Sequence, residues 1–263
     1  MRRPAAAEAA PTAGAPGAGV GGVRAKMFRM AAPRIALIHA TPLAVDPVNR
    51  AFERLWPVAT RMNLLDDSLS ADRVREGSLT PAMTQRFETL ALYARDTGCA
   101  GILFTCSAFG PAIEAAGRAC GLPTLKPNEA MFAQALAALP PGGRAALVAT
   151  FGPSIAPMCE EFAAMSAAAS ASIGRTVPTL QTHVVPGAMQ ALAYGDATAH
   201  DAAIAACVAG ITDVDLVMLA QFSMSGALAA AQAATSARVL TSPDCAVLAL
   251  RAALASSDDT IPS

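Results

Sequence analysis

The sequence has little charge, few aromatic side chains and no long apolar run. Of its 263 residues, 15% are charged and 5% are aromatic, and the net charge is −1. This balance predicts no basic surface that would bind nucleic acid or an anionic membrane. The most apolar stretches, 214–220 and 227–234, are short and contain Asp or Gln. They do not reach the roughly 20 apolar residues of a spanning helix, so no membrane partner is expected.

Metal ligands are also scarce. The chain has only three histidines, and its six cysteines form no CxxC pair. We therefore expect no zinc site and no bound metal. Scattered cysteines at apolar positions are typical of small buried side chains in a reducing compartment, which predicts a cytoplasmic protein. This packing role is our interpretation of all of them except Cys106.

What the chain does have is alanine-rich apolar sequence, with 54% hydrophobic residues. That content excludes a disordered chain, which combines low hydrophobicity with high net charge. Periodicity predicts strands alternating with helices, which favours an α/β fold with a parallel sheet covered on both faces. Thr80 is a predicted N-cap, followed by Pro81. The predicted strands are 34–40, 61–65, 100–105 and 122–126, and the predicted helices are 47–60, 80–97 and 110–120.

Residues 1–33 differ from the rest of the chain. They are rich in Ala, Gly and Pro and show neither helical nor strand periodicity, so we expect a disordered tail. Arg2 and Arg3 suggest an export signal, but the apolar core of such a signal is missing. We interpret the segment as dispensable, or as lying upstream of a true start at Met27 or Met30.

An internal repeat divides the remaining sequence. Residues 101–131 align without a gap on 216–246, and 34–41 resembles 144–151. The repeat predicts two pseudo-symmetric, Rossmann-like halves, with the active site in the cleft between them, because ligands bind beyond the carboxyl ends of parallel strands. We place the halves at 34–140 and 141–240, with 241–255 packing back on the first.

Cys106 is the main candidate functional residue. It follows a predicted strand and lies just before a helix, where positive potential favours the thiolate and lowers the pKa of the thiol. Ser107 and nearby backbone N–H groups could hold a carboxylate there. The alternative is a buried, inert thiol.

Other polar residues also follow predicted strands. Gln221 stands at the equivalent position of the second half, with Ser223 close to it. Further strand ends carry His39, Thr41, Thr150 and Ser154. Each of these residues alone is more often a cap or turn residue. Together they predict a ring of polar groups around one acid/base centre.

The strand ending in Cys106, the duplicated half around Gln221 and the Ala149-Thr150-x-Gly152 turn resemble the aspartate/glutamate racemase superfamily. This group includes hydantoin racemases, maleate isomerase-like enzymes and arylmalonate decarboxylases. The resemblance covers about residues 34–255. It implies catalysis without pyridoxal phosphate, metal or any other cofactor, with one cysteine from each half facing the substrate. It also implies a homodimer.

Carried over, the first family cysteine matches Cys106, and Ser107-Ala108 stands where racemases often have Asn-Thr. The second cysteine falls on Gln221, which cannot exchange a proton near neutral pH. Two-base racemisation requires an ionisable group on each side of the α-carbon. His39 or another group would have to replace the lost cysteine; alternatively, one thiol suffices for decarboxylation or cis–trans isomerisation.

The sequence thus predicts an isomerase-type enzyme acting on a small carboxylate, with Cys106 and Gln221 at the catalytic positions. The alternatives are a single-cysteine decarboxylase and a non-catalytic carboxylate binder that lost one catalytic half. Lys126 is open to two interpretations: a partner for a substrate carboxylate, or a salt bridge with Glu129. The predicted substrate-binding residues are His39, Thr41, Ser107, Ala108, Thr150, Ser154, Phe222 and Ser223.

Overall fold

The computed structural model describes residues 32–174 and 176–258. All but two residues of the predicted tail, 1–33, lie outside the described residues. No helix of the described part is long and apolar enough to span a membrane.

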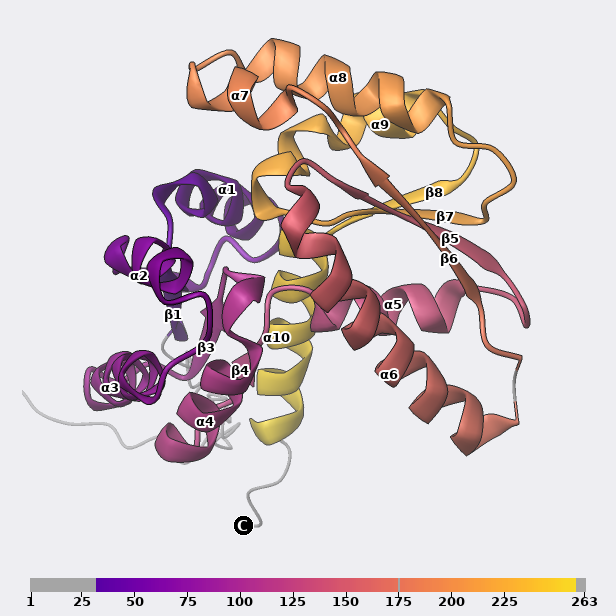
Figure 1. The fold of residues 1–263 in the computed structure, drawn as a ribbon. Coiled ribbons are helices and arrows are strands. Elements are labelled where there is room, and N and C mark those ends of the chain that lie inside the picture. The colour runs from indigo at the N-terminus through magenta and orange to yellow at the C-terminus, as the bar shows by residue number, and fades with distance from the viewer. Residues whose placement is uncertain (1–31, 175, 259–263) are drawn as a thin grey trace, which may run out of the picture. The chain divides into compact units, whose positions relative to one another are not determined.

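The first sheet contains four parallel strands in the order β2-β1-β3-β4 (Figure 1). Its strands are β1 (Arg34–His39), β2 (Thr60–Leu65), β3 (Gly101–Phe104) and β4 (Thr124–Leu125). This order requires crossover connections, which helices supply. The helical elements are η1 (Pro42–Ala44), α1 (Val45–Leu55), α2 (Ser68–Glu76), α3 (Pro81–Asp96), η2 (Ser107–Phe109), α4 (Gly110–Cys120) and α5 (Glu129–Ala138).

The second sheet repeats this topology in the order β6-β5-β7-β8. Its strands are β5 (Arg144–Ala149), β6 (Thr179–Val184), β7 (Leu216–Leu219) and β8 (Arg238–Thr241). β7 lies 115 positions after β3, and β5 lies 110 positions after β1, so the predicted repeat is confirmed. The helical elements are η3 (Gly152–Ser154), α6 (Ile155–Ile173), α7 (Ala188–Ala193), α8 (Ala197–Ala209), η4 (Phe222–Ala227), α9 (Leu228–Ala233) and α10 (Ser242–Asp258).

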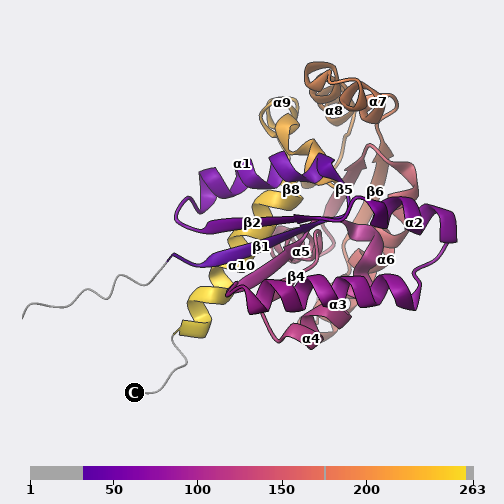
Figure 2. The same cartoon turned by 90° about the vertical axis from the view of Figure 1, so that its left-hand side faces the viewer.

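Both sheets are buried on their two faces because successive strand residues point in opposite directions. In β1, Ala36 and Ile38 pack in a cluster with α3 and α4. Ile35 and Leu37 pack in the opposite cluster, with α1 and α10. Figure 2 shows α1 and α3 on opposite sides of this sheet. The predicted α/β fold with two parallel-sheet halves is confirmed.

Two helices pack on the sheet that their own half does not contain. α5, which follows the first sheet in the chain, packs with β5 and β7 of the second sheet. α10 follows the second sheet, yet Ala246, Val247 and Leu250 pack with Ile35 and Leu37 of the first. Each half therefore contributes a helix to the apolar core of the other, and these shared cores hold the two halves together.

Several helices begin and end where capping residues predict. Thr80 Oγ1 accepts a hydrogen bond from the Met83 N–H at 3.3 Å, which confirms the predicted N-cap of α3. The predicted helix over 47–60 is too long, because α1 ends at Leu55. Trp56 precedes Pro57, and a proline disfavours the helical conformation of the residue before it.

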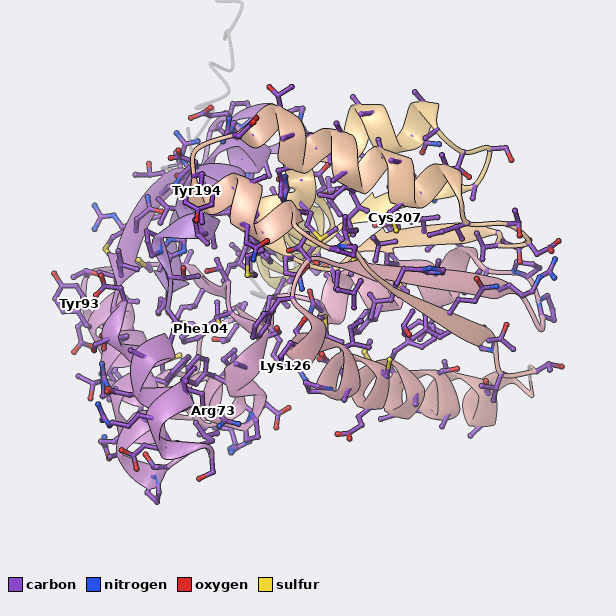
Figure 3. All side chains as sticks on the ribbon, turned by 45° about the horizontal axis from the view of Figure 1, so that its top comes forward. Arg73, Tyr93, Phe104, Lys126, Tyr194 and Cys207 are labelled. Atoms are coloured by element: carbon purple, nitrogen blue, oxygen red, sulfur yellow. The ribbon has the colours of Figure 1, made fainter. Side chains whose placement is uncertain are left out.

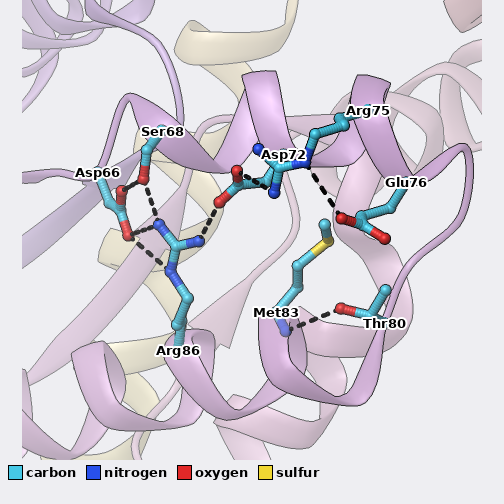
Figure 4. Close-up of polar contacts among 8 residues, drawn as sticks. All are labelled: Asp66, Ser68, Asp72, Arg75, Glu76, Thr80, Met83 and Arg86. Atoms are coloured by element: carbon cyan, nitrogen blue, oxygen red, sulfur yellow. Dashed lines mark hydrogen bonds and ion pairs between the residues drawn. The ribbon is translucent and has the colours of Figure 1, made fainter.

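No sequence pattern predicted α2. Leu69 is the one buried residue of α2 among the described side chains. The sequence of α2 therefore lacks the periodic apolar pattern that predicts a helix. Charge holds it instead: Arg86 of α3 makes ion pairs with Asp66, at the start of the turn before α2, and with Asp72 within it (Figure 4). Burial works against the charged form of Asp66, but Arg86 outweighs it and lowers the pKa of this carboxyl group.

Candidate functional site

The carboxyl ends of the two sheets meet. η1, which follows β1, contacts η4, which follows β7, and Ala44 shares an apolar cluster with Phe222 (Figure 1). In parallel sheets, ligands usually bind along the edge formed by the residues just beyond the carboxyl ends of the strands. The site is therefore built from segments that follow β1, β3, β5 and β7.

Cys106 lies on this edge. β1 pairs with β3 so that Ile38 stands opposite Phe104, and the chain continues through Thr105 to Cys106. Cys106 has extended backbone (φ −124°, ψ 120°) and caps η2, after which α4 begins at Gly110. Its side chain is half-buried, as is Ser107. Ala108, two residues on, is exposed.

The surroundings of Cys106 do not favour the expected thiolate. Burial raises the pKa of the Cys106 thiol, although a hydrogen bond from the Ala108 backbone N–H acts in the opposite direction. At neutral pH the group is a neutral thiol, which can donate a proton.

Gln221 is bonded within the second half. Its Oε1 accepts the Thr150 backbone N–H at 3.0 Å, and its Nε2 donates to Ser154 Oγ at 2.9 Å. The Ser154 hydroxyl in turn donates to the Phe151 carbonyl at 2.7 Å. This chain of donors and acceptors fixes which end of the amide is oxygen. Gln221 thus joins the ends of β5 and β7.

His39 is fully buried, and both ring nitrogens have partners. Nε2 donates to Asn63 Oδ1 at 3.0 Å, and Nδ1 lies 2.9 Å from Thr105 Oγ1. Asn49 Nδ2 also donates to Asn63 Oδ1, which marks that atom as the acceptor. Burial lowers the pKa of His39, against the opposing effect of the Asn63 hydrogen bond. The structure does not bring His39 to the site as a replacement base or as a substrate ligand.

Some of the other predicted binding residues cap or pack within the fold, and others lie at the strand ends. Thr41 Oγ1 accepts from the Leu43 N–H at 3.4 Å and caps η1. Phe222 is 3% exposed and belongs to the apolar cluster of α1 and α10, which favours a packing role over the predicted contact with substrate. Ser223 is half-buried and follows Gln221 by two residues, while Thr150 is buried at the end of β5. Cys106, Ser107 and Ser223 are half-buried on this edge, as are Thr41, Ser154 and Gln221.

Lys126 follows β4 and is already paired. Its Nζ lies 3.1 Å from Glu114 of α4 and 3.2 Å from Glu161 of α6, so it joins the first half to a helix of the second (Figure 3). One interpretation of Lys126 was a salt bridge with Glu129, but its ion pairs are with Glu114 and Glu161 instead. Glu129 affects the pKa of Lys126 only through its charge. Burial favours the neutral amine, but the glutamates outweigh it and raise the pKa of Lys126.

The other five cysteines pack as predicted. Cys99 and Cys120 belong to the cluster of α3 and α4, Cys159 and Cys245 to that of α5 and α6, and Cys207 to that of α8. Burial, together with the nearby Asp244 charge, raises the pKa of Cys245 to about 12. All six cysteines are free thiols. Over residues 32–174 and 176–258, no three His, Cys, Asp or Glu side chains gather as metal ligands.

Two parallel four-stranded sheets of identical strand order, whose carboxyl ends meet, define a class of two-half α/β proteins. No protein-family model matches the chain, and no curated protein matches it. Solved structures do. A glutamate racemase from Bacillus anthracis is 13% identical with a TM-score of 0.61, over 86% of this chain and 82% of that chain.

Two further structures have the same fold. Allantoin racemase from Klebsiella pneumoniae is 15% identical with a TM-score of 0.61, over 86% of this chain and 89% of that one. An arylmalonate decarboxylase is 16% identical with a TM-score of 0.54, over 84% and 92%. The chain therefore has the aspartate/glutamate racemase superfamily fold that the resemblance predicted.

One exposed residue on this edge was missed by sequence reasoning. Phe151 follows β5 by two residues and is 44% exposed. The available signal was a large aromatic side chain between two predicted polar candidates, Thr150 and Ser154.

Proposed function

We propose that the protein is a cofactor-independent enzyme that acts on a small carboxylate, with Cys106 as its acid/base thiol. The fold is shared with racemases and a decarboxylase. The observation that carries the proposal is one half-buried thiol at the strand-end edge where the two halves meet.

A raised pKa favours the protonated thiol in the resting state, which suits Cys106 to act first as an acid. The proton acceptor would be an enolate, formed when the bond between the α-carbon and a carboxylate of the substrate breaks and carbon dioxide leaves. The thiol donates its proton to the α-carbon, and the resulting thiolate is then reprotonated from solvent. A proton donor placed within hydrogen-bond reach typically contributes about 10²–10⁴-fold to the rate.

Two-base racemisation is less well supported. The amide of Gln221 cannot give or take a proton near neutral pH, and its oxygen and nitrogen are already bonded to Thr150 and Ser154. His39 is neutral, buried and bonded through both nitrogens. One-sided protonation therefore fits best: decarboxylation of a malonate-type substrate, in which carbon dioxide leaves, the bonding electrons form the enolate, and Cys106 supplies the proton.

The competing function is a non-catalytic carboxylate binder. Its specific support is the same bonded Gln221, which would be the remnant of a lost catalytic half. The two functions differ in one observable property: an enzyme turns over its carboxylate, and a binder only holds it.

The experiment is a turnover screen in heavy water with amino acids, maleate and substituted malonates. Loss of optical activity with deuterium at the α-carbon would identify racemisation, and released carbon dioxide would identify decarboxylation. Conversion of maleate to fumarate would identify cis–trans isomerisation.

The Cys106→Ser variant should lose about 10²–10⁴-fold of whichever activity is found. Cys207→Ser is the matched control, because Cys207 is also a half-buried thiol whose pKa is raised by burial. Full activity in Cys106→Ser would remove the role given to this residue. Binding of a carboxylate without turnover of any substrate would favour the binder.

A further inference from the structure

A cavity of about 300 Å³ is lined by α5, by α6 and by the segments that lead into β5 and β6. Pro140 lies shortly before β5, and Pro178 comes directly before β6, so the cavity is at the amino ends of these strands. Cys106 and Gln221 follow the carboxyl ends of strands. Figure 1 shows α5 and α6 on the same face of the second sheet, where they share an apolar cluster. The cavity is therefore separate from the proposed catalytic edge.

Ser166 of α6 lines the buried part of this cavity and is 1% exposed. Its Oγ is buried and has no hydrogen-bond partner among the described residues. A serine inside a helix often bonds the carbonyl four residues before it, but the Ser166 hydroxyl makes no such bond. A buried hydroxyl without a partner has lost its bonds to water and gained none in exchange, so a ligand that bonds to it is favoured. Ser166 thus gives the cavity one fixed hydrogen-bonding point.

Small side chains surround the opening of the cavity. Ala133 and Ala137 of α5 and Thr176, shortly before β6, line the cavity and are exposed, whereas Ser166 is buried. A small molecule can therefore enter from solvent between these residues and reach the hydroxyl. The volume is at the lower end of the range for ligand pockets, which is about 300–1,000 Å³. Such pockets are mostly apolar with a few placed polar groups, as this one is.

The walls of the cavity are mainly apolar and carry no charge among the described lining residues. Leu136 of α5 and Met165 of α6 are the large apolar side chains, with alanines and prolines between them. The polar side chains of the described lining are the hydroxyl groups of Ser166, Ser170 and Thr176. An ion would lose its hydration in these walls without finding an opposite charge. The lining therefore favours a neutral ligand.

We propose that the cavity between α5 and α6 is a second ligand site, which binds a small neutral molecule with an apolar body and one hydroxyl or carbonyl oxygen. The Ser166 hydroxyl bonds to that oxygen. Leu136, Met165 and Pro178 contact the apolar body. The site is independent of Cys106, and its test requires no turnover.

Cyclohexanol is the probe, and the methyl group of Met165 reports its binding. The protein is labelled with ¹³C in its methionine methyl groups, and a Met165→Leu variant identifies the Met165 resonance. Cyclohexanol should shift this resonance saturably. It should not shift the resonance of Met224, which is buried in the cluster of α8 and α9. Cyclohexylammonium, which has the same ring and a charge, should bind at least about tenfold more weakly.

Variants test the hydroxyl and the place of binding. Ser166→Ala should weaken cyclohexanol binding about three- to tenfold through one lost hydrogen bond, and it should not lower the melting temperature of the free protein. Ser242→Ala is the matched control for stability, because Ser242 is also buried but donates to Asn128 Oδ1 at 2.7 Å. It should melt at a lower temperature. Ala137→Phe should block the opening and abolish binding, whereas Ala138→Phe alters an exposed neighbour outside the lining and should retain it.

Each part of the proposal has its own contradicting result. No saturable shift of Met165 in the folded protein would overturn the site, and it would leave the role of Cys106 unaffected. Equal affinity in Ser166→Ala would overturn the hydrogen bond to the ligand. Equal affinity for cyclohexylammonium would overturn the ligand class. Binding that persists in Ala137→Phe would place the ligand elsewhere on the protein.

Discussion

Replacing Phe222 by alanine should destabilise the protein strongly while leaving the chemistry of the edge in place. Phe222 is 3% exposed and packs with Ile35, Leu37 and Phe52 of the first half, although it follows β7 of the second. Removal of a buried phenylalanine side chain costs about 3–5 kcal/mol, which combines lost burial with the cavity left behind. Because this ring ties the two halves together, the variant should unfold at a much lower urea concentration.

Urea unfolding of both Phe222→Ala and the wild type measures this change, with stability taken from the midpoint at an unchanged slope. Phe151→Ala is the matched control, since the same atoms are removed from a residue that is 44% exposed. It should cost less than about 1 kcal/mol. Equal losses in the two variants would refute the distinction between a core Phe222 and an exposed Phe151.

Three smaller predictions concern charge and capping. Arg86→Met should lower stability by about 1 kcal/mol and speed amide exchange within α2, because its ion pairs are partly exposed. The pKa of His39 is lower in the folded protein than its ordinary value of about 6.5, so the unfolded chain binds the proton more readily. Melting temperature should therefore fall as pH drops below about 6.5, and a His39→Gln variant should show a smaller fall. Thr80→Ala should cost about 1 kcal/mol in thermal unfolding through the lost N-cap of α3, and an unchanged melting temperature would contradict that role.

Much of the fold could be predicted because the two halves repeat. β3 and β7 are short, fully buried strands, and β1 and β5 share the same burial pattern, so their apolar runs stood out. α2 could not be predicted in this way. It buries Leu69 and is otherwise held by the ion pair between Asp72 and Arg86 of the next helix.

The places of Cys106 and Gln221 in the fold were easier to predict than their surroundings. Cys106 and Gln221 lie at the carboxyl ends of equivalent strands, which spacing alone indicated. Their environments could not be obtained from spacing. The pKa of the Cys106 thiol is set by burial, and the role of Gln221 is set by bonds to Thr150 and Ser154 in a segment some 70 residues away.

The stereochemistry of protonation tests the central claim most directly. A prochiral disubstituted malonate, such as methyl(phenyl)malonate, is decarboxylated in heavy water, and the α-carbon of the product is examined for deuterium and configuration. Protonation by one thiol, Cys106, predicts a product that carries one deuterium and is a single enantiomer. A racemic product, or an equal rate and configuration from Cys106→Ser, would contradict the account.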